Sequence, residues 1–112
     1  MKYLKRLTLA ASIVLASNGA YATEEAPSIS YNWKNIRLST ASCLKRAKKA
    51  MGKADFSFIT RKSLVVGSNF NSGFGYKGTV VCMTGKRMVL FIVSGPDFSM
   101  TQKLNAIIKK NF

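Results

Sequence analysis

Two apolar runs in the second half of the chain form the strongest pattern in the sequence. Residues 77–84 and 87–94 are rich in apolar and β-branched side chains and are separated by Gly85 and Lys86. Two such runs joined by a short glycine-containing turn predict a β-hairpin. Both runs are apolar at odd and even positions alike. We therefore expect the hairpin to lie in the middle of a sheet and to be covered on both faces.

Residues 29–33 alternate apolar and polar side chains, which predicts a short edge strand with Ile29, Tyr31 and Trp33 on one side. Trp33 is the single tryptophan of the chain. A tryptophan more often anchors a core or its rim than it offers a platform to a ligand, although both roles occur. We therefore expect Trp33 to pack.

Residues 55–60 predict a second strand, residues 61–63 a turn and residues 64–67 a third strand. Residues 68–76 mix glycine and asparagine with aromatic side chains, as is typical of a surface loop. Its aromatic residues are Phe70, Phe74 and Tyr76. They either tuck back under the loop or are offered to a partner. Burial is favoured, because a series of exposed aromatics promotes aggregation.

An amphipathic helix of about three turns is predicted between Ser39 and Gly52. Ser39 and Thr40 supply hydroxyl caps, and Gly52 stands where a left-handed C-cap belongs. The apolar stripe consists of Cys43, Leu44, Ala47, Ala50 and Met51. The other side holds Lys45, Arg46, Lys48 and Lys49, with Lys53 just beyond the helix. Cations near the C-terminal end also complement the helix dipole, so part of this basic run has a structural reason.

A second amphipathic helix is predicted at the C-terminal end. Gly95 and Pro96 end the last strand, and Asp97 or Ser99 caps the helix. One side of the helix is apolar and consists of Met100, Leu104, Ile107 and Ile108, with Phe112 closing it. The other side is polar and consists of Gln102, Lys103, Asn105, Lys109 and Lys110. This division predicts a helix packed on a sheet.

The order of the elements is strand, helix, two strands, hairpin, helix. It predicts an α+β two-layer sandwich, in which an antiparallel sheet of four or five strands carries both helices on one face. With 112 residues the chain has room for one small domain. We place this domain at residues 29–112, after a flexible lead-in at residues 23–28.

The first 22 residues have the pattern of a signal peptide. Cations within residues 1–6 precede an apolar run at residues 7–16, which is too short to span a bilayer. Residues 20–22, Ala-Tyr-Ala, place small residues at the two positions that a signal peptidase reads. Cleavage after Ala22 leaves 90 of the 112 residues and predicts a periplasmic or secreted protein. An uncleaved anchor is the alternative, which the polar residues 17–19 disfavour.

Cys43 and Cys82 are the only two cysteines. In an oxidising compartment such a pair forms a disulfide, and Cys43 faces inward from the predicted helix toward the sheet. Closing a loop of about 40 residues removes about 4 kcal/mol of denatured-state entropy, which is comparable to the stability of a small domain. A redox pair would show C-x-x-C spacing, and a metal site would need further ligands. We expect a structural helix-to-sheet disulfide.

The chain is strongly basic. It has 18 lysines and arginines against four acids, and three cations leave with the leader, so the mature chain carries a net charge of +11. Such a surface attracts anionic partners over a Debye length of about 8 Å. The charge fits several anionic partners: nucleic acid, phosphorylated glycolipid, acidic lipid headgroups or an acidic protein. Charge alone does not distinguish among them.

The chain lacks the residues on which the common hydrolytic enzymes depend. The chain has no histidine, which removes Ser-His and Cys-His pairs and most zinc sites. Asp55 and Asp97 are the only acids in the predicted domain, and each starts an element, where an acid has a capping role. A glycosidase using these two carboxylates is possible on number alone. We predict a protein that is not an enzyme and has no metal, cofactor or catalytic residue.

The chain resembles a family of small exported bacterial proteins of unassigned function. The matching positions are Trp33, Cys43, Leu44, Ala47, Cys82, Val93, Gly95 and Pro96, followed by the C-terminal amphipathic helix. The resemblance spans nearly the whole mature chain. It implies a leader, a helix-to-sheet disulfide and a compact α+β fold, and it implies no activity. The high lysine content is not part of the pattern.

Three functions fit these observations. The first is a binding protein for an acidic protein partner, in an inhibitor, immunity-type or envelope accessory role. The second is a binder of anionic surfaces such as lipopolysaccharide, acidic phospholipid or DNA. In the third, the positive charge is dispersed and has no dedicated ligand. The candidate binding residues are Lys45, Arg46, Lys48, Lys49, Lys53, Lys109 and Lys110, with Phe70, Phe74 and Tyr76.

Overall fold

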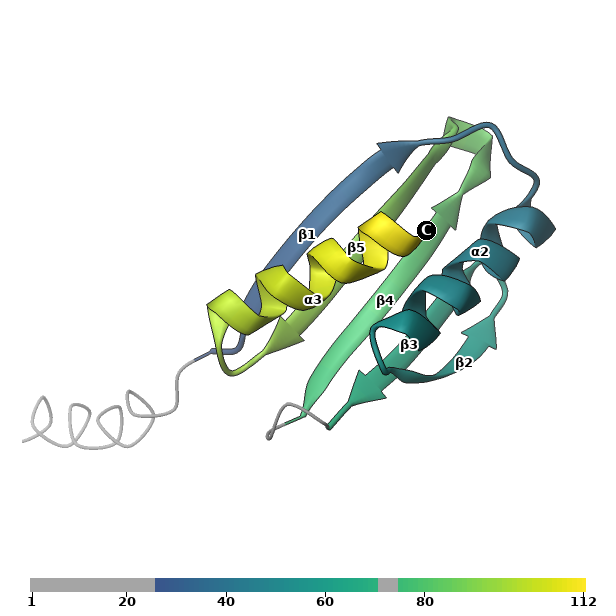
Figure 1. Ribbon diagram of the computed structural model, residues 1–112. Helices are drawn as coiled ribbons and strands as arrows, with labels where there is room; N and C mark the ends of the chain where they lie inside the picture. Colours follow the sequence, from purple (N-terminus) through teal and green to yellow (C-terminus); the bar gives the residue numbers. More distant parts are fainter. Residues whose placement is uncertain (1–25, 71–74) are drawn as a thin grey trace, which may run out of the picture.

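The structure, a computed structural model, describes residues 26–70 and 75–112. It is an α+β two-layer sandwich, as predicted (Figure 1). The elements are β1 (Ser28–Asn35), α2 (Thr40–Lys53), β2 (Ser57–Arg61), β3 (Leu64–Asn69), β4 (Tyr76–Met83), the 3₁₀ turn η1 (Thr84–Lys86), β5 (Met88–Gly95) and α3 (Phe98–Asn111). The five strands form one antiparallel sheet in the order β1-β5-β4-β3-β2, and both helices lie on one of its faces. The predicted leader at residues 1–22 lies outside the described residues.

The predicted hairpin is confirmed and lies at the centre of the sheet. β4 and β5 pair from Lys77 opposite Ser94 to Met83 opposite Met88. The turn η1 joins them, and Arg87 takes the left-handed conformation that closes it, with φ of 53°. An arginine in this region of backbone space is uncommon, because its side chain crowds the backbone there.

The hairpin is covered on only one face, so the expectation of two covered faces is wrong. Alternate residues of β4 and β5 are buried beneath the helices, among them Val80, Val89 and Phe91. The residues between them, such as Val81 and Leu90, remain half exposed. The apolar residues on both sides of these strands therefore have two different environments. Those on one face are buried, and those on the other form an apolar surface that is uncovered.

The edge strand β1 is confirmed, but its apolar side is not buried. Tyr31 is 68% exposed and Trp33 is 53% exposed, so the expected packing of Trp33 is wrong. The polar side of β1 faces α3 instead. There the buried side chain of Asn105 donates hydrogen bonds from Nδ2 to the main-chain oxygens of Ser30, at 2.9 Å, and Phe91, at 3.1 Å. These bonds satisfy buried polar groups and take the place of apolar packing between helix and strand.

Helix α2 begins as predicted and ends two residues later than predicted. The Oγ of Ser39 accepts a hydrogen bond from the main-chain N–H of Ser42 at 3.1 Å, which makes Ser39 the N-cap. Gly52 lies inside the helix, so its expected role as the left-handed cap is wrong. Asp55 takes that conformation with φ of 63°, and the N–H of Phe56 donates to the main-chain oxygen of Met51. This is a Schellman motif closed by an aspartate, which tolerates positive φ better than most residues.

Helix α3 has the predicted cap and the predicted apolar side. The carboxylate of Asp97 accepts a hydrogen bond from the N–H of Met100 at 3.2 Å. Leu104 and Ile108 are buried against the sheet, and Phe112 is buried at the end of the helix. Its ring packs edge-on against Phe91, with the ring centroids 5.4 Å apart.

The predicted loop at residues 68–76 is shorter than expected. Ser68 and Asn69 belong to β3, and Tyr76 begins β4. Asn69 is buried, and its Nδ2 donates to the main-chain oxygen of Ala54 at 2.7 Å, which ties the end of β3 to the end of α2. Tyr76 is buried over Gly95, where a Cβ would collide with its ring. The glycine is therefore needed for this close approach.

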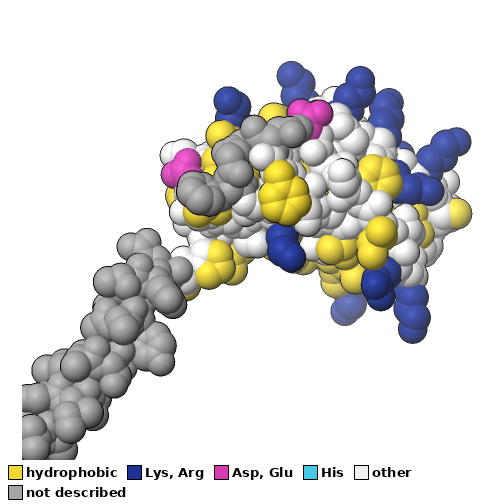
Figure 2. Space-filling view, turned by 90° about the horizontal axis from the view of Figure 1, so that it is seen from below, with side chains coloured by type: hydrophobic (Ala, Val, Ile, Leu, Met, Phe, Trp, Pro, Cys, Tyr) yellow, Lys and Arg dark blue, Asp and Glu magenta, His cyan; other side chains and the backbone are white. Residues whose placement is uncertain are grey.

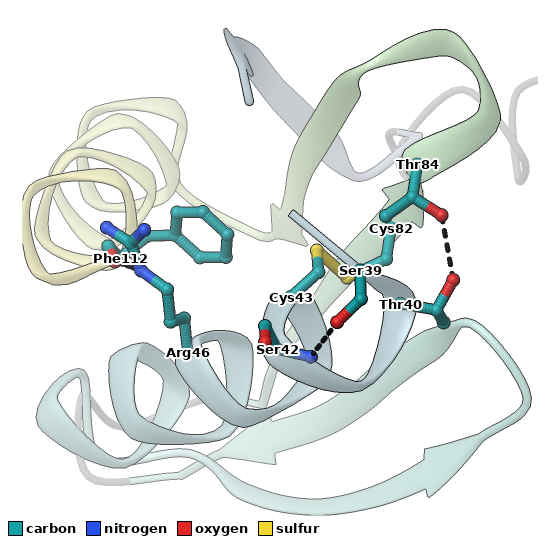
Figure 3. Close-up of a disulfide and its surroundings, with 8 residues drawn as sticks. All are labelled: Ser39, Thr40, Ser42, Cys43, Arg46, Cys82, Thr84 and Phe112. Carbon is teal, nitrogen blue, oxygen red and sulfur yellow. Dashed lines mark hydrogen bonds between the residues drawn. A yellow bond between two sulfur atoms is a disulfide. The ribbon is translucent and has the colours of Figure 1, made fainter. Parts of the chain in front are cut away.

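The predicted disulfide joins Cys43 of α2 to Cys82 of β4 (Figure 3). The two Cα atoms are 6.0 Å apart, and both cysteines are buried. Beside it, the hydroxyl oxygens of Thr40 and Thr84 are 2.7 Å apart, in hydrogen-bond contact. The start of α2 is thus tied to the sheet by one covalent bond and one hydrogen bond.

Loss of this disulfide is predicted to lower the free energy of unfolding by about 4 kcal/mol, because the denatured chain regains the freedom of a loop of about 40 residues. The measurement is urea unfolding of the oxidised protein, of the reduced protein and of the double variant Cys43→Ala/Cys82→Ala. If the free energy of unfolding falls with urea concentration at a similar slope in the three samples, unfolding exposes the same amount of surface in each. Unfolding midpoints that coincide in the three samples would contradict the prediction.

Candidate binding surfaces

The acids of the described residues have structural positions. Asp97 caps α3, and Asp55 closes the turn after α2. Within residues 26–70 and 75–112, no group of three or more His, Cys, Asp and Glu side chains could hold a metal ion. In the same part of the chain, no helix combines the length and the apolar character needed to cross a membrane.

The first surface is formed by lysines on the outer sides of the two helices. Helix α2 buries Cys43, Ala47, Ala50 and Met51, and this stripe directs the residues between them away from the sheet. The exposed lysines of the two helices are Lys45, Lys48, Lys49 and Lys53 of α2 and Lys103 and Lys110 of α3. We call these six residues the basic helical surface. It combines two segments of sequence that lie some fifty residues apart, because α2 and α3 pack side by side on the sheet (Figure 1).

Arg46 was predicted to bind an anion, but the structure gives it a contact within the protein. Its Nε donates a hydrogen bond to the main-chain oxygen of Phe112 at 2.7 Å, and its guanidinium carbon lies 4.9 Å from the centroid of the Phe112 ring (Figure 3). Lys34 approaches the same ring, with Nζ 6.0 Å from the centroid. Arg46 therefore joins α2 to the end of α3.

Lys109 also has a contact within the protein. Its Nζ lies 3.1 Å from Oδ1 of Asn32, and the side chain is half buried between α3 and β1. Lys110, the next residue, is exposed. The predicted basic set thus divides into two contacts that hold elements together, Arg46 and Lys109, and five exposed lysines.

The favoured burial of the loop aromatics is found for Tyr76 and not for Phe70. Phe70 is 69% exposed, whereas Tyr76 is 3% exposed and cannot stack on a partner. Phe74 lies outside the described residues. Phe70 follows Asn69, whose side chain donates to the main chain of Ala54 just after α2, and its ring lies against Gly75.

A second basic cluster lies at one end of the sheet and was not found from the sequence. Asn35, Ile36, Arg37, Lys86 and Arg87 line a hollow of about 390 Å³. The N–H of Ile36 donates to the main-chain oxygen of Arg87 at 3.0 Å, which brings the three cations of the two segments together. Only the pairing of β1 with β5 reveals this, because the two segments are fifty residues apart in the chain.

The third surface is the side of the sheet opposite the helices. Ile29, Tyr31, Trp33 and Ile59 are exposed there. Leu64, Val66, Val81, Met83, Met88, Leu90 and Ile92 are half exposed and lie on the same side by strand register. We call these eleven residues the open sheet face. Figure 2, which views the molecule from one end, shows apolar side chains at the surface among the projecting lysines and arginines.

The signal for the open sheet face was present in the sequence. β1 alternates, with its apolar side chains on one side, and the hairpin strands are apolar at odd and even positions alike over residues 80–83 and 88–93. A central strand covered on one face needs only alternate apolar residues. The surplus apolar residues therefore had two possible causes, a second covering layer or an uncovered apolar surface, and the structure shows the second.

Replacing Arg46 by methionine is predicted to lower the free energy of unfolding by about 1–2 kcal/mol, because a charge-assisted hydrogen bond and a cation–π contact with Phe112 are lost. The matched control is Lys48→Met, which removes the same charge from the same helix and is expected to change stability by less than about 0.5 kcal/mol. Thermal and urea unfolding measure both variants. Equal stability of the two would show that the contact with Phe112 contributes nothing.

The molecule therefore offers a basic helical surface, a cationic hollow and an apolar sheet face, each placed by the strand order and by the helices on one side. None of them contains a reactive group beside a base. Comparison with known proteins supplies no further guide to their use, since no family model, no curated protein and no solved structure matches the chain.

Proposed function

We propose that this protein is a small exported binding protein without catalytic activity, and that its basic helical surface engages an acidic protein partner. The observation that carries the proposal is the collection of exposed lysines from α2 and α3 on one layer of the fold. Inhibitor, immunity-type and envelope accessory roles all belong to this class. In each, charge complementarity speeds the encounter and helps to select the partner.

The balance of charge supports an anionic partner. Residues 26–70 and 75–112 contain fifteen lysines and arginines and two acids. Two acids can neutralise at most two of these cations, and one of the acids, Asp97, caps a helix. Most of the lysines therefore repel one another unless an outside anion approaches, and a protein with a carboxylate-rich surface provides that anion.

The rigidity of the helical layer supports a specific partner over a diffuse one. α2 is tied to β4 by the disulfide and to the end of α3 by Arg46. Lys45 lies between these two points, and Lys48, Lys49 and Lys53 follow on the same helix, so the lysines of α2 are carried on an element that is fixed to the sheet. A preorganised set of charges loses less entropy when it binds than the same charges on a flexible segment.

Export supports the same role. The pattern of residues 1–22 predicts a signal peptide, and a buried disulfide is compatible with an oxidising compartment such as the periplasm or the exterior. A small stapled domain with no reactive group fits the demands on a binding protein there.

The second candidate function is binding to an anionic envelope surface, of lipopolysaccharide or acidic phospholipid. The observation that favours it is the exposed ring of Phe70, on a molecule whose helices carry exposed lysines. An exposed aromatic on a basic protein suits a lipid interface, where the ring inserts and the ammonium groups meet phosphates. DNA offers phosphates to the same lysines.

The test compares three probes at several salt concentrations: poly-L-glutamate, phosphatidylglycerol vesicles and duplex DNA. We expect poly-L-glutamate to bind best and its affinity to fall as salt rises. The triple variant Lys45→Gln/Lys48→Gln/Lys49→Gln should lose about tenfold in affinity, since three exposed ion pairs contribute about 0.5 kcal/mol each. Tighter binding to vesicles than to poly-L-glutamate would favour the second candidate.

The matched control is Lys62→Gln/Lys77→Gln/Lys86→Gln, which removes the same charge from exposed positions outside the basic helical surface. It should weaken binding much less than the helical triple variant does. If both variants lose the same affinity, binding depends on the net charge of the protein and not on the basic helical surface.

The predicted export of the chain can be tested separately. Expressed in a bacterial host with an intact secretion pathway, the chain should be recovered outside the cytosol with Thr23 as its first residue and no titratable thiol. Intact mass and thiol titration measure both properties. A full-length chain with two free thiols would contradict export.

A further inference from the structure

The open sheet face is built from cross-strand rows, which the strand register defines. One row is Trp33, Leu90, Val81, Leu64 and Arg61. The next is Tyr31, Ile92, Thr79, Val66 and Ile59. Met83 and Met88 extend the face beyond the Trp33 row, toward the hairpin turn. At the opposite end of the face lies a row of Ile29, Ser94, Lys77, Ser68 and Ser57. The face is thus apolar across all five strands in its middle and polar at one end.

Charges are nearly absent from this face. Arg61 and Lys77 are its only charged side chains within residues 26–70 and 75–112, and both lie at its border, on an edge strand and in the polar row. The lysines proposed to engage an acidic partner are exposed residues of the two helices, and these helices lie on the opposite side of the sheet (Figure 1). The middle of the face therefore offers no charge to an acidic surface, and an apolar occupant fits it best.

We propose that the open sheet face binds a second copy of this chain, so that the two sheets stack into a sandwich with the helices outside. Two sheets pack face to face about 10 Å apart with their strands near −30°, and a two-fold axis lets each copy present the same apolar rows to the other. This inference goes beyond the proposed function and does not rest on it.

The size of the face is sufficient for a stable dimer. Three full rows of five strands and the shorter row of Met83 and Met88, with strands about 4.8 Å and rows about 6.7 Å apart, give the whole face an area of roughly 600 Å² per copy. Two copies then bury about 1,200 Å² in total, which exceeds the roughly 1,000 Å² expected of a specific interface. The eleven apolar residues account for roughly 350 Å² of it, which is in the range of the largest apolar patch on a monomer, often a functional one.

The distribution of charge allows two strongly basic copies to meet in this way. In the sandwich the two helical layers lie on the outside, about 30 Å apart across two sheets and the helices that cover them. That separation is several Debye lengths at physiological salt, so the repulsion between the basic helical surfaces is screened. A contact between the helical layers of two copies would instead bring their lysines toward each other.

Tyr31 and Trp33 are the expected anchors of the interface. Both are more than half exposed, and aromatic side chains dominate the binding energy of protein interfaces. Trp33 is also the only tryptophan of the chain, so its fluorescence reports on this face alone.

The experiment measures oligomeric state and Trp33 emission over a dilution series of the purified, disulfide-bonded protein. We expect a dimer by sedimentation at high concentration, with Trp33 emission moving to shorter wavelength as the dimer forms. Higher salt should leave the dimer intact or strengthen it, in contrast to binding by the basic helical surface. The variant Tyr31→Lys should weaken the dimer at least about tenfold, since a buried charge replaces an anchor.

Two controls match this variant. Gln102→Lys adds the same charge on an exposed position of α3, and Phe98→Ser removes an aromatic side chain that is 50% exposed but lies outside the open sheet face. Both should dimerise like the unaltered protein. Urea unfolding checks that Tyr31→Lys keeps its fold, as expected for a side chain that is 68% exposed.

Three results would overturn the proposal. The protein could stay monomeric at the highest concentration. A dimer could form that Tyr31→Lys does not weaken, which would place the contact elsewhere, for example at the free edge of β1. The emission of Trp33 could shift only when phosphatidylcholine or phosphatidylglycerol vesicles are added to a monomer, which would assign the face to a lipid surface.

Discussion

The placement of both helices on one side of the sheet determines the rest of the molecule. Two helices of 14 residues are each about 21 Å long and about 10 Å wide, so side by side they cover roughly the width of five strands. No further helix exists within the described residues to cover the other side. The disulfide from Cys43 to Cys82 and the contact of Arg46 with Phe112 fix this arrangement. One side of the molecule is consequently basic and the other apolar.

Local sequence patterns predicted the elements well because their causes are local. The caps Ser39 and Asp97 and the hairpin depend on residues close together in the chain. The end of α2 was placed wrongly at Gly52, because Asp55 closes the helix with positive φ although glycine is the usual residue there. The prediction of a structural disulfide was confirmed. Cys43 lies on the inward side of α2, and this side faces the sheet that carries Cys82.

The candidate residues were predicted less well because their roles depend on contacts between distant segments. Arg46 and Lys109 share the charge of their neighbours but reach Phe112 and Asn32, more than sixty residues away in each case. Trp33 alternates as a buried residue would, but α3 packs on the other side of β1, where Asn105 donates to Ser30, so the side that carries Trp33 is open. Periodicity gives the side of a strand on which a residue lies, but not which side is covered.

A small basic domain gains from keeping its two kinds of surface apart. If the lysines bordered the apolar rows throughout, burial of those rows would bring like charges together and would oppose association. Here the sheet itself separates them, since alternate residues of a strand point to opposite faces. The same alternation that buries Val80 and Phe91 under the helices leaves Val81 and Leu90 uncovered on the far side. The two surfaces can therefore act independently, with salt weakening contacts made by one and favouring contacts made by the other.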